Sequence, residues 1–409
     1  MKYGLIGEKL GHSFSREIHM RLANYDYELC EIARDRLDGF MCRRDFAAIN
    51  VTIPYKQAVM PYLDCIDSAA ERIGAVNTVV NRDGVLYGYN TDFAGMKALI
   101  LHCGVQIDGA RVLVLGSGGT SHTALAVCES MRAASVHRVS RTGRDGCITY
   151  DDAYRMGADV IINTTPCGMY PNVGGMPVDL DRLGGVRGVV DAVYNPLRTA
   201  LICNARARGI TAEGGLYMLV AQAAAAVKHF IGRDVDADRI ERVYRQLMNE
   251  NQNIVLVGMP SSGKSTVGRA LAERMGRRFI DTDDEIVART GRSITDIFEH
   301  EGEGAFRDIE SEVIAQLAPI RGAVIATGGG AVLRGQNVLC LRQNGRIYYI
   351  DRPLEQLTGT PDRPLARDTD ALRRRYEERH DIYLAAADCV IPSTTVERNA
   401  DSIAEEFLK

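Results

Sequence analysis

Several features that mark particular protein classes are missing from this sequence. Its ten cysteines form no C-x-x-C pair and no zinc-ligand spacing, which argues against a zinc finger or a disulfide scaffold. The longest apolar helix candidate, 216–227, contains Gln222 and falls short of the ~20 residues that span a membrane. The start, Met1 to Gly4, reaches Glu8 and Lys9 without a long apolar region, so no secretory signal is expected. These absences predict a cytoplasmic protein with reduced thiols.

A strong excess of one charge is also missing. The formal net charge of −4 comes from 49 basic and 53 acidic residues, a mixture that argues against nucleic-acid and membrane-surface binding. Apolar residues make up 46% of the 409 residues, enough for sizeable cores without disulfides. The length predicts two or three domains of about 100–200 residues, and no repeat, low-complexity tract or signal for oligomeric state is present.

Alternating strand and helix patterns divide the chain. Residues 1–100 mix short apolar runs with polar turns, whereas 101–214 alternate strands and helices in the manner of a parallel doubly wound sheet. Helices follow at about 215–248, and the short polar stretch 249–253 is expected to be a linker. Residues 254–409 again alternate strands and helices. The sequence therefore predicts an α/β protein.

The most informative motif is Gly258-Met-Pro-Ser-Ser-Gly-Lys-Ser-Thr266. A buried strand is expected before it, and a helix is expected after it at Val267–Met275. This arrangement is a phosphate cradle: loop N–H groups point inward, Lys264 can reach the β- and γ-phosphates, and the Ser265 hydroxyl can bind Mg²⁺. The expected ATP-binding residues are Pro260, Ser261, Ser262, Gly263, Lys264, Ser265 and Thr266.

Two further features follow expected strands of the same region. Asp281 and Asp283, at i and i+2 on a strand end, would point the same way and could hold a Mg²⁺-bound water and an acceptor hydroxyl. A helix N-cap cluster is the alternative for this pair. The consecutive glycines 328–330 would let backbone N–H groups approach a ligand closely, with a plain turn as the alternative.

These motifs, with the run Phe306-Arg-Asp-Ile-Glu310, the run Asp362-Arg-Pro-Leu365, and Arg379 before Tyr383, resemble shikimate kinase over about residues 252–409. The resemblance implies a P-loop α/β kinase with a parallel sheet that phosphorylates the 3-hydroxyl of shikimate with MgATP. Leu357 stands where family members often carry an arginine that packs on adenine, so the adenine contact is the least certain part of this comparison.

The resemblance also implies residue roles. Lys264 and Asp283 would serve catalysis, Ser265 and Asp281 would support Mg²⁺, and Arg363 would meet the phosphate from a mobile lid. The guanidinium groups suit bidentate recognition of the substrate carboxylate. The implied shikimate-binding residues are Asp283, Arg307, Gly329, Gly330 and Arg379.

A partial dinucleotide fingerprint, Gly116-Ser-Gly-Gly-Thr-Ser121, lies between an expected strand at Arg111–Leu115 and an expected helix. Ser121 replaces the third glycine and is small enough for helix–strand packing; an unrelated turn is the alternative. After the next strand, an NAD site would carry an acidic residue, but here Ser140-Arg-Thr142 offers a cation and two hydroxyls. This predicts NADP(H), unless Arg141 is a solvated turn residue.

Polar turns of the first region carry Ser13, Ser15, the motif Asn50-Val-Thr-Ile-Pro-Tyr-Lys56, Asn77 and the run Tyr89-Asn-Thr-Asp92. Each alone is more typical of a turn than of a site. Together they contain the side chains needed to hold a polyhydroxylated acid.

With Asn163-Thr-Thr-Pro-Cys-Gly168 and Gly215-Leu-Tyr-Met-Leu-Val-Ala-Gln222, these motifs resemble shikimate dehydrogenase over about residues 1–248. The resemblance implies a substrate domain (1–100 plus returning helices 215–248) and a Rossmann-like NADP-binding domain (101–214). Lys56 would donate the proton to the alkoxide and Asp92 would orient it, unless the two form a mere surface ion pair. The implied substrate-binding residues are Ser13, Ser15, Thr52, Lys56, Asn77, Asp92, Tyr194 and Gln222, and the implied cofactor-binding residues are Gly116, Ser117, Gly118, Gly119, Thr120, Ser140, Arg141, Thr142 and Gly215.

Departures from the dehydrogenase pattern are mild, with Arg16 at a common proline position and Ser140 at a common asparagine position. The combined hypothesis is a bifunctional enzyme that reduces 3-dehydroshikimate with NADPH and phosphorylates the resulting shikimate with MgATP. One alternative is an NAD-dependent quinate/shikimate oxidoreductase fused to a kinase. The other is a non-catalytic metabolite-sensing regulator, which retention of Lys56, Asp92 and Lys264 argues against.

Overall fold

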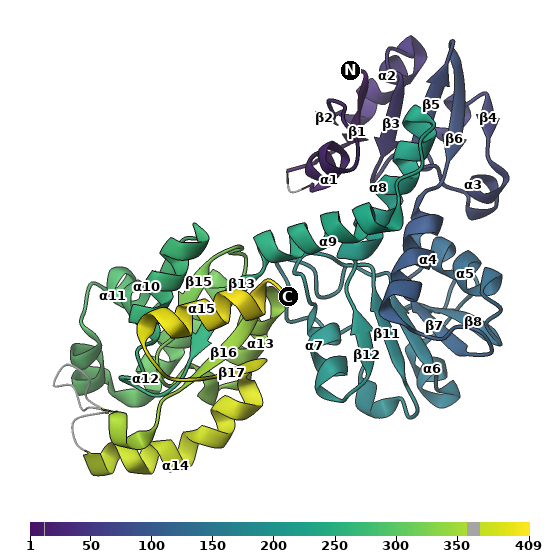
Figure 1. The fold of residues 1–409 in the computed structure, drawn as a ribbon. Helices are drawn as coiled ribbons and strands as arrows, with labels where there is room; N and C mark the ends of the chain where they lie inside the picture. The colour runs from purple at the N-terminus through teal and green to yellow at the C-terminus, as the bar shows by residue number, and fades with distance from the viewer. Residues whose placement is uncertain (12, 358–368) are drawn as a thin grey trace. The chain divides into compact units, whose positions relative to one another are not determined.

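The computed structural model describes residues 1–11, 13–357 and 369–409 (Figure 1). They form two compact units. The first comprises Met1–Asn195 with Asn204–Gln246, and the second comprises Pro196–Cys203 with Leu247–Lys409. Both units are built from strands that alternate with helices, so the α/β fold class expected from the sequence is confirmed.

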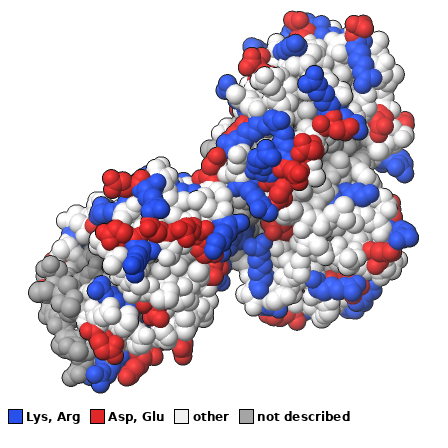
Figure 2. Space-filling model, in the orientation of Figure 1, with Lys and Arg blue, Asp and Glu red and all other residues white. Residues whose placement is uncertain are grey.

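The distribution of surface charge and the state of the cysteines agree with what the composition predicts. Figure 2 shows basic and acidic side chains interspersed over the face in view, without a large area of one sign. All ten cysteines are free thiols. Among the described residues, no helix combines the length and the apolar content that crossing a membrane requires.

Six strands of the first unit form a mixed sheet in the order β2-β1-β3-β5-β6-β4. Strand β1 is parallel to β2 and β3, whereas β5 is antiparallel to β3 and β6. All four residues of β3 are buried, as expected for a strand with neighbours on both sides. The elements are β1 (Tyr3–Gly7), α1 (Ser15–Leu22), β2 (Glu28–Glu31), α2 (Leu37–Arg43), β3 (Ala48–Val51), β4 (Cys65–Ile66), α3 (Ser68–Ile73), β5 (Thr78–Arg82) and β6 (Val85–Tyr89).

The remaining strands of the first unit form a parallel sheet in the order β12-β11-β10-β7-β8-β9. Strand β7 lies between β8 and β10, so the winding direction reverses there. Ligands of such sheets bind beyond the carboxyl ends of the strands at this point. The elements are α4 (Asp92–Cys103), β7 (Arg111–Leu115), α5 (Gly119–Ser130), β8 (Ser135–Val139), β9 (Cys147–Ile148), α6 (Tyr150–Met156), β10 (Val160–Asn163), β11 (Gly188–Asp191), α7 (Ala200–Ala207) and β12 (Thr211–Glu213). The first half of α7, up to Cys203, is assigned to the second unit.

Helix α8 (Leu216–Ile231) links the two sheets of the first unit. Near its start, Met218 belongs to the core of the parallel sheet. Near its end, Phe230 packs with Tyr27 in a core of the mixed sheet. A residue at mid-helix, such as Gln222, is therefore placed between the two sheets.

Two expected boundaries fall inside helices. Leu99 and Ile100 of α4 belong to the core of the parallel sheet, so the expected boundary near residue 100 cuts through that helix. The expected linker 249–253 overlaps the end of α9 (Ala237–Asn251) and the first residue of β13. The polar composition of 249–253 does not reveal that its first residues continue a helix, because packing decides where a helix ends.

The second unit contains a parallel sheet in the order β14-β15-β13-β16-β17. Strand β13 lies in the middle, and all five of its residues are buried, as is typical of strands covered on both faces. The elements are β13 (Asn253–Val257), α10 (Lys264–Met275), β14 (Phe279–Asp281), α11 (Thr282–Thr290), α12 (Ile294–Leu317), β15 (Val324–Ala326), α13 (Gly335–Asn344), β16 (Gly345–Asp351), α14 (Thr369–Ala386), β17 (Cys389–Pro392) and α15 (Val396–Phe407).

Candidate active sites

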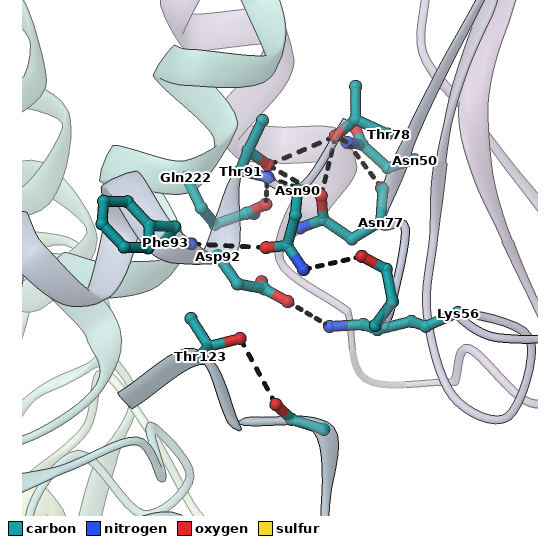
Figure 3. A network of polar contacts seen from close by, with 12 residues as sticks. Asn50, Lys56, Asn77, Thr78, Asn90, Thr91, Asp92, Phe93, Thr123 and Gln222 are labelled. Atoms are coloured by element: carbon teal, nitrogen blue, oxygen red, sulfur yellow. Dashed lines mark hydrogen bonds and ion pairs between the residues drawn. The ribbon is translucent and has the colours of Figure 1, made fainter. Parts of the chain in front are cut away.

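Lys56 and Asp92 form an ion pair in the first unit. The Lys56 Nζ lies 2.5 Å from Oδ2 of Asp92, and Figure 3 shows the two side chains pointing toward one another. Their side chains are 24% and 12% exposed, so this pair is more enclosed than a solvated surface pair. Asp92 opens helix α4, where the helix N-terminus favours a carboxylate. The Asp92 carboxylate therefore fixes the position of the Lys56 amino group, which could donate a proton to a nearby reacting oxygen.

A buried hydrogen-bond network adjoins this pair (Figure 3). Oδ1 of Asn77 accepts from the Thr91 N–H at 2.7 Å and from the Thr78 hydroxyl at 3.0 Å. The Thr91 hydroxyl lies 3.2 Å from this oxygen and 3.3 Å from Oε1 of Gln222. Because one hydroxyl proton serves one acceptor at a time, these side chains can readjust when a ligand arrives.

Asn50 supports the network from strand β3. Its Oδ1 accepts from the Tyr27 hydroxyl at 2.8 Å, and its Nδ2 donates to Thr78 Oγ1 at 3.0 Å and to the Asn77 carbonyl at 3.3 Å. Asn50 is only 5% exposed, so its polar atoms are satisfied inside the protein, as buried amides require. The sequence analysis assigned no role to this residue.

Four other expected substrate residues are placed as follows. The Ser13 hydroxyl donates to Ser15 Oγ at 3.0 Å. The Tyr194 ring contacts the ring of Phe14 in a tilted arrangement, with 5.9 Å between ring centroids, and Phe14 lies between the two serines. The Thr52 N–H donates to the Ile6 carbonyl at 3.0 Å, which holds the start of the Lys56 turn against β1.

The dinucleotide fingerprint forms the turn from β7 into α5. Gly116 has a φ of 122°, and a Cβ there would lie 2.6 Å from Thr164 Oγ1, so glycine is required. Cβ positions at Gly118 and Gly119 meet no atom within 4 Å, so their backbone is open to a pyrophosphate. Ser121 is fully buried and donates to the Gly118 carbonyl at 2.6 Å.

The other expected cofactor residues lie at the start of α8 and after β8. A Cβ at Gly215 would lie 2.2 Å from the Ala192 carbonyl oxygen, so no side chain fits at the start of α8. Ser140 follows β8, and its Oγ accepts from the Gly143 N–H at 3.1 Å. Arg141 and Thr142 are exposed, which leaves their donors accessible to an anion. Together, these residues fit a dinucleotide with an additional phosphate.

In the second unit, the loop after β13 has the geometry of a phosphate cradle. Gly258, Ser261 and Gly263 have φ values of 149°, 64° and 91°, a conformation that turns successive N–H groups into a concave nest. Lys264 is 5% exposed, and its Nζ donates to the carbonyls of Gly258 at 3.0 Å and Met259 at 2.8 Å. The loop and Lys264 fit the phosphates of a nucleoside triphosphate.

Asp281 has two roles in the structure. Its Oδ2 accepts from the Ser265 hydroxyl at 2.6 Å, and its Oδ1 accepts from the Asp283 N–H at 3.0 Å as the N-cap of α11. Asp283 therefore lies on the helix and not on the strand end, which corrects the expected i, i+2 strand geometry. The capping preference of aspartate ends the strand at Asp281. Ser265 and Asp281 together supply oxygen ligands of the kind that Mg²⁺ prefers.

Arg307 is buried in an ion-pair cluster and is not the solvated helix residue that an isolated arginine usually is. Nη1 donates to Glu310 Oε2 at 2.8 Å, and Nη2 donates to Glu303 Oε1 at 3.1 Å. Burial raises the pKa of the fully buried Glu310, Arg307 lowers it, and Asp283 raises it further. Among the described residues, Arg307 Nε and Glu310 Oε1 have no hydrogen-bond partner, so this cluster retains both a donor and an acceptor.

The consecutive glycines allow close approach by other parts of the protein. A Cβ at Gly328 would lie 2.7 Å from Asp283 Oδ1, and one at Gly330 would lie 2.2 Å from the Arg307 guanidinium. The Gly329 carbonyl accepts from Arg379 Nη1 at 3.4 Å and from the Tyr383 hydroxyl. Arg379 is 6% exposed. Arg363 lies outside the described residues.

Comparisons with known proteins match the N-terminal and the C-terminal parts of the chain to two different families. A family model for the shikimate dehydrogenase substrate-binding domain matches residues 5–79. The chain is 37% identical over 265 residues to a shikimate dehydrogenase (NADP(+)) from Clostridium perfringens, and the match covers 60% of this chain and 97% of that protein. The chain belongs to the shikimate dehydrogenase family. A shikimate kinase family model matches residues 260–409, so this dehydrogenase carries a C-terminal shikimate kinase domain.

Solved structures agree with the dehydrogenase assignment. A chorismate mutase/shikimate 5-dehydrogenase fusion protein from Clostridium acetobutylicum is 37% identical, with a TM-score of 0.57, and the match covers 60% of this chain and 96% of that chain. A quinate dehydrogenase from Corynebacterium glutamicum in complex with NAD is 26% identical, with a TM-score of 0.54 and coverage of 60% and 99%. The fold is therefore shared by proteins with different cofactors, and the cofactor must be argued from side chains.

The structure adds three residues that the sequence analysis left without roles. Asn50 and Thr91 complete the network around Asn77, and Glu310 pairs with Arg307. Glu310 could have been found from its i, i+3 spacing on a helix. Asn50 and Thr91 carry no such signal, because the hydrogen bonds that define them join segments far apart in the chain.

Proposed function

We propose that this bifunctional enzyme of the shikimate pathway reduces 3-dehydroshikimate to shikimate with NADPH and then transfers the γ-phosphoryl group of MgATP to the shikimate 3-hydroxyl. The observation that carries the first activity is the half-buried Lys56–Asp92 pair at 2.5 Å. It adjoins a network of hydroxyls and amides suited to a polyhydroxylated acid. The name of the C. perfringens relative supports NADP as the cofactor.

The dehydrogenase mechanism assigns the proton to Lys56. NADPH, when bound, supplies the hydride that converts the ketone carbon to an alcohol carbon. The Lys56 ammonium donates the accompanying proton to the carbonyl oxygen, and Asp92 orients Lys56 through their hydrogen bond. Thr91, Asn77 and Gln222 hold the ring hydroxyls, and the serines at 13 and 15 bind the carboxylate end.

The cofactor assignment follows from charge. The NADP 2′-phosphate needs cationic and hydroxyl donors, whereas the free 2′-hydroxyl of NAD needs an acceptor carboxylate. Arg141 and Thr142 are exposed donors at the end of β8, and Ser140 adds a hydroxyl. This distribution supports NADP(H).

The kinase mechanism relies on positioning and charge. The loop N–H groups and Lys264 hold the β- and γ-phosphates, and Mg²⁺, when bound at Ser265 and Asp281, neutralises developing charge. Asp283 accepts the hydrogen bond of the attacking 3-hydroxyl. Arg307 and Arg379 bind the carboxylate of shikimate, and the unpartnered Nε of Arg307 supports this assignment.

One experiment tests both activities together. The purified chain receives 3-dehydroshikimate, NADPH and MgATP, and nicotinamide absorbance and ADP release are followed in the same sample. Absorbance should fall first, and ADP should appear after a delay because shikimate must accumulate before it is phosphorylated. Adding shikimate at the start should remove the delay. Absence of ADP in that control would contradict the kinase proposal alone.

The structural similarity to a quinate dehydrogenase supports one alternative, an NAD-dependent quinate/shikimate oxidoreductase. This alternative predicts that NADH and quinate give the higher kcat/KM. Comparing both cofactors with both substrates decides between the two assignments.

A further inference from the structure

The loop 140–146, between β8 and β9, carries the proposed 2′-phosphate residues in a tightly turned conformation. Gly143, Asp145 and Gly146 have φ values of 62°, 55° and 72°. Asp145 is the non-glycine residue of the three, and aspartate adopts a positive φ less readily than glycine does. An interaction at Asp145 would therefore stabilise this conformation of the loop.

Arg138 supplies that interaction from strand β8. Its Nη2 donates to the Asp145 carbonyl at 2.6 Å, at the non-glycine residue with a positive φ in this turn. A Cβ at Gly146 would lie 3.4 Å from the same nitrogen, so the guanidinium packs against the turn.

His122 fixes the other side of this guanidinium. Arg138 Nη1 lies 2.9 Å from His122 Nε2. Arginine can only donate, so Nε2 must accept and the imidazole is neutral. Burial and the Arg138 charge both lower the pKa of His122, which agrees with the neutral form. His122 lies in the first turns of α5, just after the dinucleotide fingerprint, so the contact ties the loop to the cofactor-binding turn.

We propose that Arg138, held by His122, is a positioning residue for recognition of the cofactor 2′-phosphate. It keeps loop 140–146 in the conformation that presents Arg141 and Thr142 to that phosphate. This inference rests on the proposed NADPH specificity and identifies residues that govern it. A purely structural role for Arg138 would affect NADPH and NADH alike, whereas the positioning role affects only the cofactor that carries the 2′-phosphate.

The test compares dissociation constants for NADPH and NADH, measured by nicotinamide fluorescence on the full chain without substrate. Arg138→Met keeps the apolar stem and removes the donors. NADPH binding should weaken about tenfold, the loss typical of one charge-assisted hydrogen bond, and NADH binding should change less than about twofold. Equal weakening of both cofactors, or no change in either, overturns the proposal.

Substitutions at His122 provide a second, milder test that leaves Arg138 in place. His122→Leu removes the acceptor and should weaken NADPH binding about threefold, whereas His122→Gln offers an amide oxygen and should bind as the wild type does. Arg155→Met serves as the matched control, because this arginine is 76% exposed and pairs only with Asp152 among the described residues. Equal dissociation constants for NADPH in the Leu and Gln variants would overturn the role of His122.

The cofactor preference of the wild-type chain shows whether the underlying assignment of NADPH is itself wrong. If the wild-type chain binds NADH as tightly as NADPH, the assignment and this inference are both wrong. If the wild type prefers NADPH and the Arg138 variant keeps that preference, only the inference is wrong.

Discussion

The ammonium nitrogen of Lys56 lies 2.5 Å from Oδ2 of Asp92, across 36 residues of chain. Lys56 follows a strand of the mixed sheet, and Asp92 opens a helix that packs on the parallel sheet. The pair therefore forms where the two sheets of the first unit meet. A proton donor placed between a substrate-binding sheet and a dinucleotide-binding sheet is what reduction of a bound ketone requires.

Replacement of Lys56 tests this placement. Lys56→Ala should lower dehydrogenase kcat by about 10²–10⁴-fold, the usual loss for an acid/base group, and leave kinase turnover unchanged. Lys97→Ala, which removes an exposed lysine of α4, is the matched control and should retain activity. Steady-state rates of the dehydrogenase and kinase reactions, measured on one preparation of each variant, test this prediction. A similar fall in both activities would show that the two sites are not independent.

Replacement of Lys264 should have the opposite selectivity. Lys264→Met should lower kinase turnover by at least about 10²-fold, because the buried ammonium no longer stabilises the transferring phosphate. NADPH oxidation with 3-dehydroshikimate should be unaffected. A kinase rate near that of the wild type, measured by ADP release, would rule out the phosphate role of Lys264.

Gly330 offers a test of the carboxylate site. Its φ of −108° permits alanine, but the added Cβ would lie 2.2 Å from the Arg307 guanidinium and displace it. Gly330→Ala should raise the shikimate KM about tenfold, as for one lost charged contact, with little change in the KM for MgATP. Gly335→Ala is the control, since a Cβ there meets no atom within 4 Å. Equal KM values for shikimate in the two variants would contradict the role of Arg307.

Arg141 is expected to contact the 2′-phosphate directly. Arg141→Ala should raise the NADPH KM about tenfold or more, as expected for a lost charged hydrogen bond. The NADH KM should stay nearly constant, so the preference between cofactors should relax. Steady-state kinetics with both cofactors measure this ratio, and an unchanged ratio would contradict the assignment.

His19 should make the stability of the first unit depend on pH. It is fully buried, and burial lowers its pKa from 6.5 to about 3, with a smaller opposing effect from Asn50. Between these values the unfolded chain binds a proton that the folded chain does not, so stability is complete above pH 6.5 and falls as pH decreases. The slope is about 1.4 kcal/mol per pH unit for one such group.

A His19→Phe variant removes this titration and keeps a ring to stack on Tyr27. Between pH 7 and pH 5 its unfolding free energy should fall by about 2 kcal/mol less than that of the wild type. Hydrogen exchange of β1 and α1 in denaturant reports on this unit separately, since two units need not unfold together. Identical slopes in both proteins would show that His19 titrates normally.

Local sequence was sufficient where a function resides in one continuous segment. The phosphate cradle is a single loop between a strand and a helix, so residues 258–266 predicted its backbone without further information. The strand–helix alternation similarly predicted parallel sheets. Gly116 and the buried Ser121 lie in a turn whose geometry follows from adjacent residues.

Tertiary structure decided whatever depends on segments that are distant in the chain. The sequence alone determined an α/β chain with a dinucleotide turn, a phosphate cradle and a supply of polar side chains. Only folding paired Lys56 with Asp92, enclosed Arg307 with Glu310, and set Arg138 against both His122 and the Asp145 carbonyl. The physical reason is that hydrogen bonds and ion pairs depend on distance in space, whereas local preferences encode only the geometry of neighbouring residues.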